Sequence, residues 1–264
     1  MKKNLRHVIW GVSAFVFLTG CATNLQVAAY RGNGQDVMEL LENGESISER
    51  DIRGLTALHY AAQGGQETIV DLLLNKGAEI NARGNRGETP LYVATYYCHE
   101  NVVRALLERG ANFTFKFKND NEFSMTPLLI ASASGCDPTI LKELLKAGAD
   151  ANGIDDQFGW SPLIFAANIG NLKTVGILLC AGGIVNHQAY DGITALIAAA
   201  GKGSKEVVQG LLAAGADQKI RANQGRGPLN SDLKPTDTAL SVAKRRGHSE
   251  VVALLEAAKK NQLK

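Results

Sequence analysis

The sequence contains little proline, few cysteines, no large excess of either charge and no long hydrophobic run. Six prolines stand against 28 glycines in 264 residues, a balance that favours short helices joined by many tight turns. A net charge of +2 gives no electrostatic footprint for nucleic acid. A mean hydropathy of −0.07 excludes a polytopic membrane protein, and a hydrophobic content of 45% predicts a chain that folds.

The first twenty residues have the pattern of a signal peptide. Lys2, Lys3 and Arg6 precede an apolar run of eleven residues from Val8 to Leu18. A bilayer span needs about 20 such residues, so this run predicts a secretory leader over residues 1–20.

The leader ends in Leu18-Thr19-Gly20-Cys21, which resembles the lipobox of bacterial lipoproteins. The resemblance implies cleavage before Cys21 and lipidation of its thiol. By the sorting habit of these proteins, Ala22 implies an outer membrane lipoprotein that faces the periplasm. The alternative is an ordinary signal peptide followed by a chance cysteine.

The rest of the chain repeats one unit. A Thr/Ser-x-Leu motif recurs at intervals of 33 to 44 residues, beginning at Thr56, Thr89, Thr126, Ser161, Thr194 and Thr238. About twenty residues after each of the first five comes a Leu-Leu-x-x-Gly motif, which ends at Gly77, Gly110, Gly148, Gly182 and Gly215. A degenerate first copy begins at Thr23.

These motifs resemble the ankyrin repeat. The resemblance implies an all-α solenoid of about seven helix-turn-helix repeats with finger-like turns, in one domain over residues 21–264. The expected repeats cover approximately residues 22–50, 51–83, 84–117, 118–154, 155–188, 189–221 and 233–258. The longer repeat intervals place extra residues in loops around 116–122 and 223–235, and these loops are either functional or flexible.

Each motif residue has a physical reason. Thr or Ser caps the N-terminus of the first helix by accepting a bond from a free backbone N–H. Leu and Val at helical spacing form the apolar stripe of the second helix, and glycine suits the left-handed residue just beyond it. No single copy can bury its own stripe, so neighbouring copies must stack.

The sequence offers little for chemistry. The five histidines, His7, His59, His99, His187 and His248, fall at no metal-ligand spacing. Gly64-Gly65 and Gly182-Gly183 lie at repeat turns, where no phosphate loop is expected. We therefore expect no enzyme, no cofactor, no metal site and no small-molecule substrate.

Three cysteines remain after Cys21, in a compartment that is expected to be oxidising. Cys98 and Cys136 fall in the loop between the two helices of adjacent copies, which predicts a disulfide bond between them. The alternative is two free thiols, because stacked copies lie about a helix diameter apart. Cys180 lies in a second helix and is expected to be a small buried residue.

Aromatic and large apolar residues gather at the finger tips and at the exposed end of the first helix, where ankyrin proteins commonly hold partners. Exposed aromatic groups are typical of interaction sites, although packing under the neighbouring finger is the alternative. The predicted partner-binding residues are Tyr96, Tyr97, Phe123, Met125, Phe158, Trp160, Ile169, Tyr190 and Ile193, and the same positions include Ile52, Arg53 and Leu55.

Two non-catalytic functions fit this reading. The first is an envelope-anchored lipoprotein that binds a protein partner and neutralises it, as an immunity or self-protection protein against a toxin or hydrolase. The second is a structural or stress-protection lipoprotein that stabilises an envelope enzyme. The membrane is contacted through the lipid on Cys21, and no nucleic acid is expected as a partner.

Overall fold

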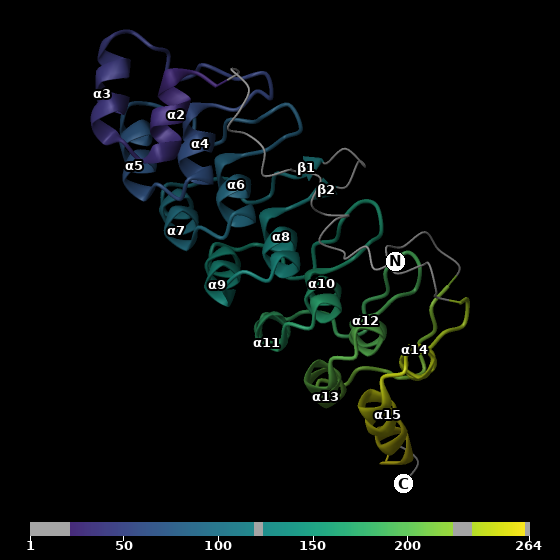
Figure 1. Ribbon diagram of the computed structural model, residues 1–264. Helices are drawn as coiled ribbons and strands as arrows, with labels where there is room; N and C mark the ends of the chain where they lie inside the picture. Colours follow the sequence, from purple (N-terminus) through teal and green to yellow (C-terminus); the bar gives the residue numbers. More distant parts are fainter. Residues whose placement is uncertain (1–21, 119–123, 224–233, 262–264) are drawn as a thin grey trace. The chain divides into compact units, whose positions relative to one another are not determined.

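The computed structural model describes residues 22–118, 124–223 and 234–261 (Figure 1). The described residues form fourteen helices in seven consecutive pairs, one for each of the seven predicted copies, and the last helix extends to Asn261, beyond the predicted end of the last copy at residue 258. This arrangement confirms the predicted all-α repeat fold. The pairs are α2 (Asn24–Arg31) with α3 (Gly34–Glu42), α4 (Ala57–Gln63) with α5 (Glu67–Asn75), α6 (Pro90–Tyr96) with α7 (Glu100–Glu108), α8 (Pro127–Ser134) with α9 (Pro138–Lys146), α10 (Pro162–Ile169) with α11 (Leu172–Cys180), α12 (Ala195–Lys202) with α13 (Lys205–Ala213), and α14 (Ala239–Arg246) with α15 (Ser249–Asn261).

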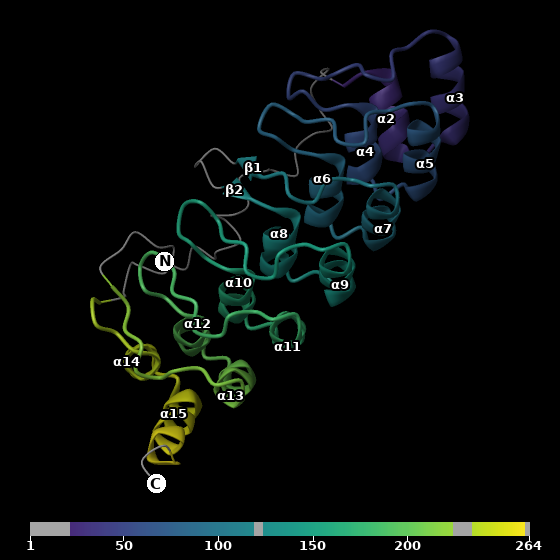
Figure 2. The same ribbon diagram turned by 180° about the vertical axis from the view of Figure 1, so that it is seen from behind.

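The chain divides into two compact units. The first unit runs to Ala131 and includes Thr139–Ala149, and the second comprises Ser132–Pro138 and the residues from Asp150 onward. Within the first unit, α2, α4 and α6 stack in one layer, and α3, α5 and α7 stack in a second layer. The second unit has the same two layers, made by α10, α12 and α14 and by α11, α13 and α15 (Figure 2).

The helices are short and begin where the sequence predicts. Thr89 and Thr194 accept a hydrogen bond from the backbone N–H three residues later, and Ser161 does the same in the fifth copy. The first helices have seven or eight residues, and the second helices have nine, except for thirteen in α15. In the described part of the chain, no helix combines the length and the apolar character that a membrane span requires.

Small side chains let the first helices approach one another closely. Ala61 and Ala62 in α4 are fully buried, as are Ala166 and Ala167 in α10. The second helices bury one apolar stripe, such as Val102, Val103 and Leu106 of α7. The core therefore lies between the two layers and between successive copies.

The finger-like turns are joined to one another through the backbone. The N–H of Asn85 donates to the carbonyl oxygen of Arg53 (2.7 Å), and the N–H of Tyr190 donates to that of Phe158 (2.9 Å). The third finger of the first unit carries two short antiparallel strands, β1 (Phe117–Lys118) and β2 (Ser124–Met125). The predicted insertion at 223–235 lies mostly outside the described residues.

Candidate functional site

The structure separates the predicted partner-binding residues into a buried group and a surface group. Trp160 and Ile193 have exposed fractions of 0%, and Met125 has one of 2%, so their predicted role as exposed contacts is wrong. Tyr96, Tyr97, Phe158 and Ile169 are half-buried, and Tyr190 is 62% exposed. Phe123 and Cys21 lie outside the described residues.

The buried group shares one position in the repeat. Met125, Trp160 and Ile193 each stand one residue before the capping Thr or Ser of a first helix, and Leu55 at the same position is also buried. This residue is in the extended segment that enters the helix, and its side chain turns under the finger. The repeat spacing locates the position, but it does not state which way an extended residue points.

Trp160 shows how a finger closes over its own aromatic residue. Asp155 accepts hydrogen bonds from the backbone N–H groups of Phe158 and Trp160, both at 2.7 Å. The indole meets Phe165 edge-on, with 5.1 Å between the ring centroids. Trp160 is therefore a core residue of the second unit.

Met125 is buried in the extended finger of the first unit. It pairs with Phe117 across the two strands, and the Phe117 ring stacks on Tyr92 with a centroid distance of 4.4 Å. The finger thus packs its apolar side chains against α6.

Two half-buried tyrosines lie at the C-terminal end of α6. The rings of Tyr96 and Tyr97 meet edge-on at 5.1 Å, and Tyr97 stacks against His99 at 6.3 Å. The Tyr97 hydroxyl accepts a hydrogen bond from Nε2 of Gln63 (3.1 Å), which is the last residue of α4. The ends of α4 and α6 therefore carry one continuous polar and aromatic surface.

Arg53 adds a fixed positive charge whose electrostatic effect reaches Tyr97. Its Nε donates to Oδ2 of Asp51 (3.2 Å), and its Nη2 donates to the Tyr60 hydroxyl (3.2 Å). The Tyr60 hydroxyl in turn donates to Asp51 (3.0 Å), and Asp51 also accepts from the backbone N–H of Leu55 (2.7 Å). This network orients the guanidinium, and about a third of the Arg53 side chain stays exposed. We call Arg53, Gln63, Tyr96 and Tyr97 the tyrosine surface.

The two tyrosines stay neutral over the physiological pH range. Burial and the neighbouring Tyr97 raise the pKa of Tyr96 to about 12. Burial also raises the pKa of Tyr97, although the bond from Gln63 and the charge of Arg53 oppose that shift. The neutral Tyr97 hydroxyl can therefore both donate and accept hydrogen bonds, whereas the Tyr96 hydroxyl oxygen is buried and Tyr96 contributes its ring to the surface. Sequence reasoning missed Gln63, whose only signal is that it occupies the repeat position of Tyr96.

The second unit presents a smaller exposed group. The Tyr190 ring covers Gly159 of the preceding finger so closely that a β-carbon there would lie 2.7 Å from it. The Tyr190 side chain is nonetheless 62% exposed, beside the half-buried Phe158.

The described cysteines differ in oxidation state. Cys98 and Cys136 are both disulfide-bonded, whereas Cys180 is a free thiol. Cys98 has a φ of 63°, in the left-handed region that disfavours residues with a side chain. The prediction that Cys180 is buried is wrong, because α11 directs Val175 and Leu178 into the core and leaves Cys180 exposed.

Each described histidine forms a hydrogen bond with a backbone carbonyl. Nε2 of His59 bonds the carbonyl of Glu88 (3.0 Å) and Nε2 of His99 bonds that of Gln63 (2.9 Å), both in a neighbouring copy. His248 bonds the carbonyl of Gly201 in the preceding copy, whereas His187 bonds that of Gly159 within its own copy. Among the described residues, no group of His, Cys, Asp and Glu is arranged to hold a metal ion.

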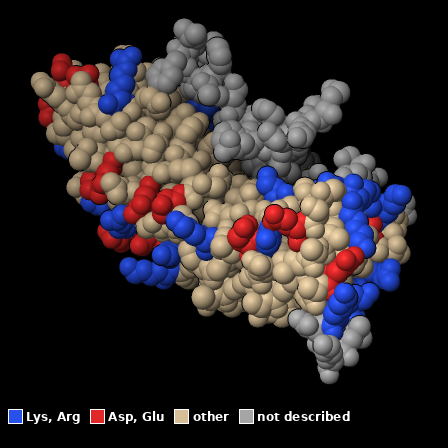
Figure 3. Space-filling model, turned by 60° about the horizontal axis from the view of Figure 1, so that its bottom comes forward, with Lys and Arg blue, Asp and Glu red and all other residues tan. Residues whose placement is uncertain are grey.

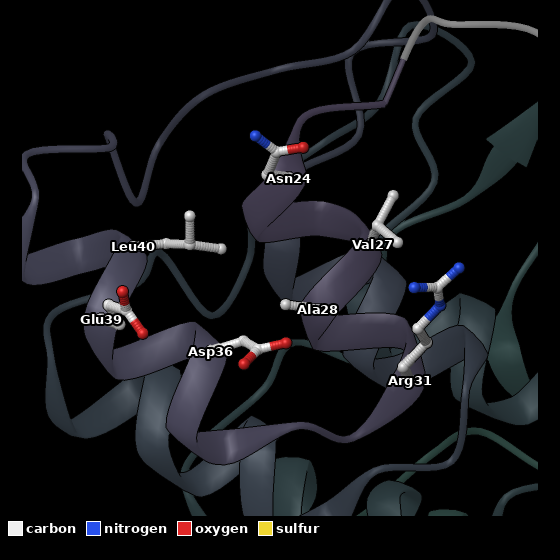
Figure 4. Close-up of a pocket in the computed structure, with 7 residues that line it drawn as sticks. All are labelled: Asn24, Val27, Ala28, Arg31, Asp36, Glu39 and Leu40. Atoms are coloured by element: carbon white, nitrogen blue, oxygen red, sulfur yellow. The ribbon is translucent and has the colours of Figure 1, made fainter.

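The first copy carries an open groove between its two helices (Figure 4). Asn24, Val27, Ala28 and Arg31 of α2 face Asp36, Glu39 and Leu40 of α3 across it. Acidic and basic side chains are interspersed over the described surface shown in Figure 3, so that face presents no extended region of one charge sign.

Known proteins share this architecture. The family model for ankyrin repeats (3 copies) matches residues 25–117 and 128–222. The chain is 38% identical over 109 residues to the mouse B-cell lymphoma 3 protein homolog, covering 41% of this chain and 24% of that protein. It is 38% identical over 88 residues to the mouse inactive serine/threonine-protein kinase TEX14, covering 33% of this chain and 6% of that protein. The matched regions thus span a quarter or less of these relatives.

Solved structures match over most of the chain. The ankyrin repeat domain of Bcl-3 is 29% identical with a TM-score of 0.68, and the match covers 89% of this chain and 98% of that domain. The human ASB11 ankyrin repeat domain is 25% identical with a TM-score of 0.74, covering 88% of this chain and 97% of that one.

Proposed function

Because the chain belongs to the ankyrin-repeat family, whose repeats form protein–protein interaction modules, we propose that it binds a protein partner through the tyrosine surface. The partner is a toxin or hydrolase of the bacterial envelope, and binding neutralises it without catalysis. The chain is held at the outer membrane, on its periplasmic side, by the lipid on Cys21.

The preorganised side chains of Arg53 and Tyr97 carry this proposal. Tyrosine and arginine are the residues most enriched among binding anchors, and an anchor binds more strongly when it is held in place beforehand. Asp51 and Tyr60 hold Arg53, and Gln63 holds the Tyr97 hydroxyl. These side chains need little further ordering when a partner arrives.

Two observations support the location. The lipobox ends at Cys21, and an acylated cysteine attaches a protein to membrane. The disulfide-bonded state of Cys98 and Cys136 fits an oxidising compartment such as the periplasm. Changing Cys21→Ser should abolish palmitate labelling and release the protein from membrane fractions, and a variant that still labels and sediments would refute the anchor.

Binding is tested by exchanging single side chains in the full chain. Tyr97→Ala should weaken capture of the partner from envelope extracts roughly 30- to 1,000-fold, which corresponds to about 2–4 kcal/mol. The matched control is Leu172→Ala, which removes an exposed apolar side chain in the second unit. Equal capture by the wild type and Tyr97→Ala would place the binding site elsewhere.

Neutralisation is tested on the captured partner. Adding the wild-type protein should inhibit the partner's activity at a one-to-one ratio, and cells that lack the chain should be sensitive to that partner. A captured enzyme that becomes longer-lived and stays fully active would instead support the stabilising role.

A further inference from the structure

We propose that the outer face of the first copy, formed by Val27, Arg31, Asp36, Glu39 and Leu40, rests on the zwitterionic phospholipid headgroups of the membrane. The proposal depends on acylation of Cys21, and it adds an orientation to that anchor. It makes the first copy a contact surface for lipid and leaves the tyrosine surface for the protein partner.

The tether between the lipid and the fold is very short. Only Ala22 separates Cys21 from Thr23, the N-cap of α2. Two residues span at most about 7 Å, even when fully extended. The start of α2 must therefore lie within about that distance of the acylated residue, and no stalk can lift the first copy from the bilayer.

The start of α2 is firmly held, so it cannot unwind to lengthen the tether. Thr23 and Gln26 form a reciprocal capping pair, with bonds of 2.9 and 3.2 Å. The Gln26 side chain is fully buried, and its Nε2 donates to the carbonyl of Leu55 in the next copy (3.0 Å). Unwinding this turn would leave these buried polar groups without partners, which is costly.

The outer face of the first copy has no helix pair stacked on it in the described structure. The register position of Asp36 holds the buried Ile69 in the second copy and the buried Val102 in the third. Leu40 corresponds to Leu73, which is fully buried, yet Leu40 itself is partly exposed. The face therefore keeps part of the apolar surface that later copies bury, and it replaces the rest with charge.

The charges of this face suit headgroups that carry both signs. Arg31 projects from α2 and can meet a phosphate, and Asp36 and Glu39 on α3 can meet ammonium groups (Figure 4). With two acids against one base, the face should be repelled by anionic lipid. Val27 and Leu40 supply the apolar contact between these charges.

The test places a fluorescent probe on this face of the acylated chain. Asp36→Cys is labelled with nitrobenzoxadiazole in a Cys180→Ser background and reconstituted in phosphatidylethanolamine–phosphatidylcholine vesicles with a headgroup spin label. Glu108→Cys is the matched control, because Glu108 is also an exposed acid on a second-layer helix of the first unit. Glu108 lies about two helix spacings, roughly 20 Å, from Asp36 along the stack of second helices.

We expect the probe at position 36 to lose most of its fluorescence and the probe at 108 to keep its own. Weak quenching at both positions in palmitate-labelled protein would overturn the orientation and leave the anchor intact. A wild-type chain that never incorporates palmitate would overturn the anchor itself.

Discussion

The imidazole of His99 lies directly over Gly65 of the preceding copy, so that a β-carbon at Gly65 would come within 2.6 Å of Nδ1. His248 stands in the same relation to Gly203 in the second unit. The residue that leads into each of these second helices thus covers the inter-helix loop of the copy before it. A glycine is required beneath it, because any side chain would meet the covering group.

Cys98 and Cys136 occupy these two register positions in the third and fourth copies. Cys98 stands where the second copy has Gly65, and Cys136 stands where the third copy has the covering His99. We therefore predict that the two form one bond, and non-reducing peptide mapping should recover them as a linked pair. Cys136→Ser should lower the free energy of unfolding by about 4 kcal/mol, the chain-entropy value for a loop of this length. Quantitative alkylation of both thiols without reductant would contradict the pairing.

Gly65→Ala should destabilise the protein more than Gly77→Ala. Both glycines have positive φ values, 69° and 91°, so each alanine costs about 1–2 kcal/mol in backbone energy. A β-carbon at Gly77 meets nothing within 4 Å, whereas one at Gly65 displaces His99 and its bond to the Gln63 carbonyl. Urea denaturation compares the two variants, and adding His99→Ala to Gly65→Ala should recover part of the loss. Equal destabilisation of the two single variants would refute the close contact.

Trp160→Ala should unfold or strongly destabilise the second unit. Removing a fully buried aromatic side chain costs about 3–5 kcal/mol. Tyr190→Ala in the same unit should change the free energy of unfolding by only about 0.5 kcal/mol, because its side chain is mostly exposed. Thermal melts followed by circular dichroism measure both. An unchanged melting temperature for Trp160→Ala would show that the indole is a surface group after all.

Stability should fall between pH 6.5 and about 4 because of His59. Burial lowers the pKa of this imidazole from 6.5 to about 4, so the folded chain keeps it neutral while the unfolded chain binds a proton. Protonation of His59 in the unfolded state therefore lowers the free energy of unfolding by about 3 kcal/mol across this interval. The effect levels off below pH 4. His59→Gln should remove this part of the pH dependence, since Gln26 fills the same capping role in the first copy. The difference between the two denaturation profiles isolates His59, and parallel profiles would contradict the assignment.

The fold could be predicted from the sequence because the repeat spacing and the capping residues specify it locally. Thr89 and Thr194 begin helices for the same chemical reason wherever the motif occurs. The side-chain direction of Trp160 could not be predicted, because it depends on the closure of the Asp155 turn over it. The role of Gln63 also depends on its bond to Tyr97 in the next copy, and the repeat spacing alone does not predict that bond.

The bonds from His59 and His99 to carbonyl oxygens of adjacent copies have an evolutionary consequence. Each of these side chains recognises a neighbour's main chain, which is the same whatever residue stands there. The bond itself does not depend on the side chain of the residue whose carbonyl accepts it, although His99 also needs a glycine at position 65 beneath its ring. Copies can then be duplicated or exchanged, and surface positions such as 96 and 97 can diversify towards a new partner while these bonds to the main chain are kept.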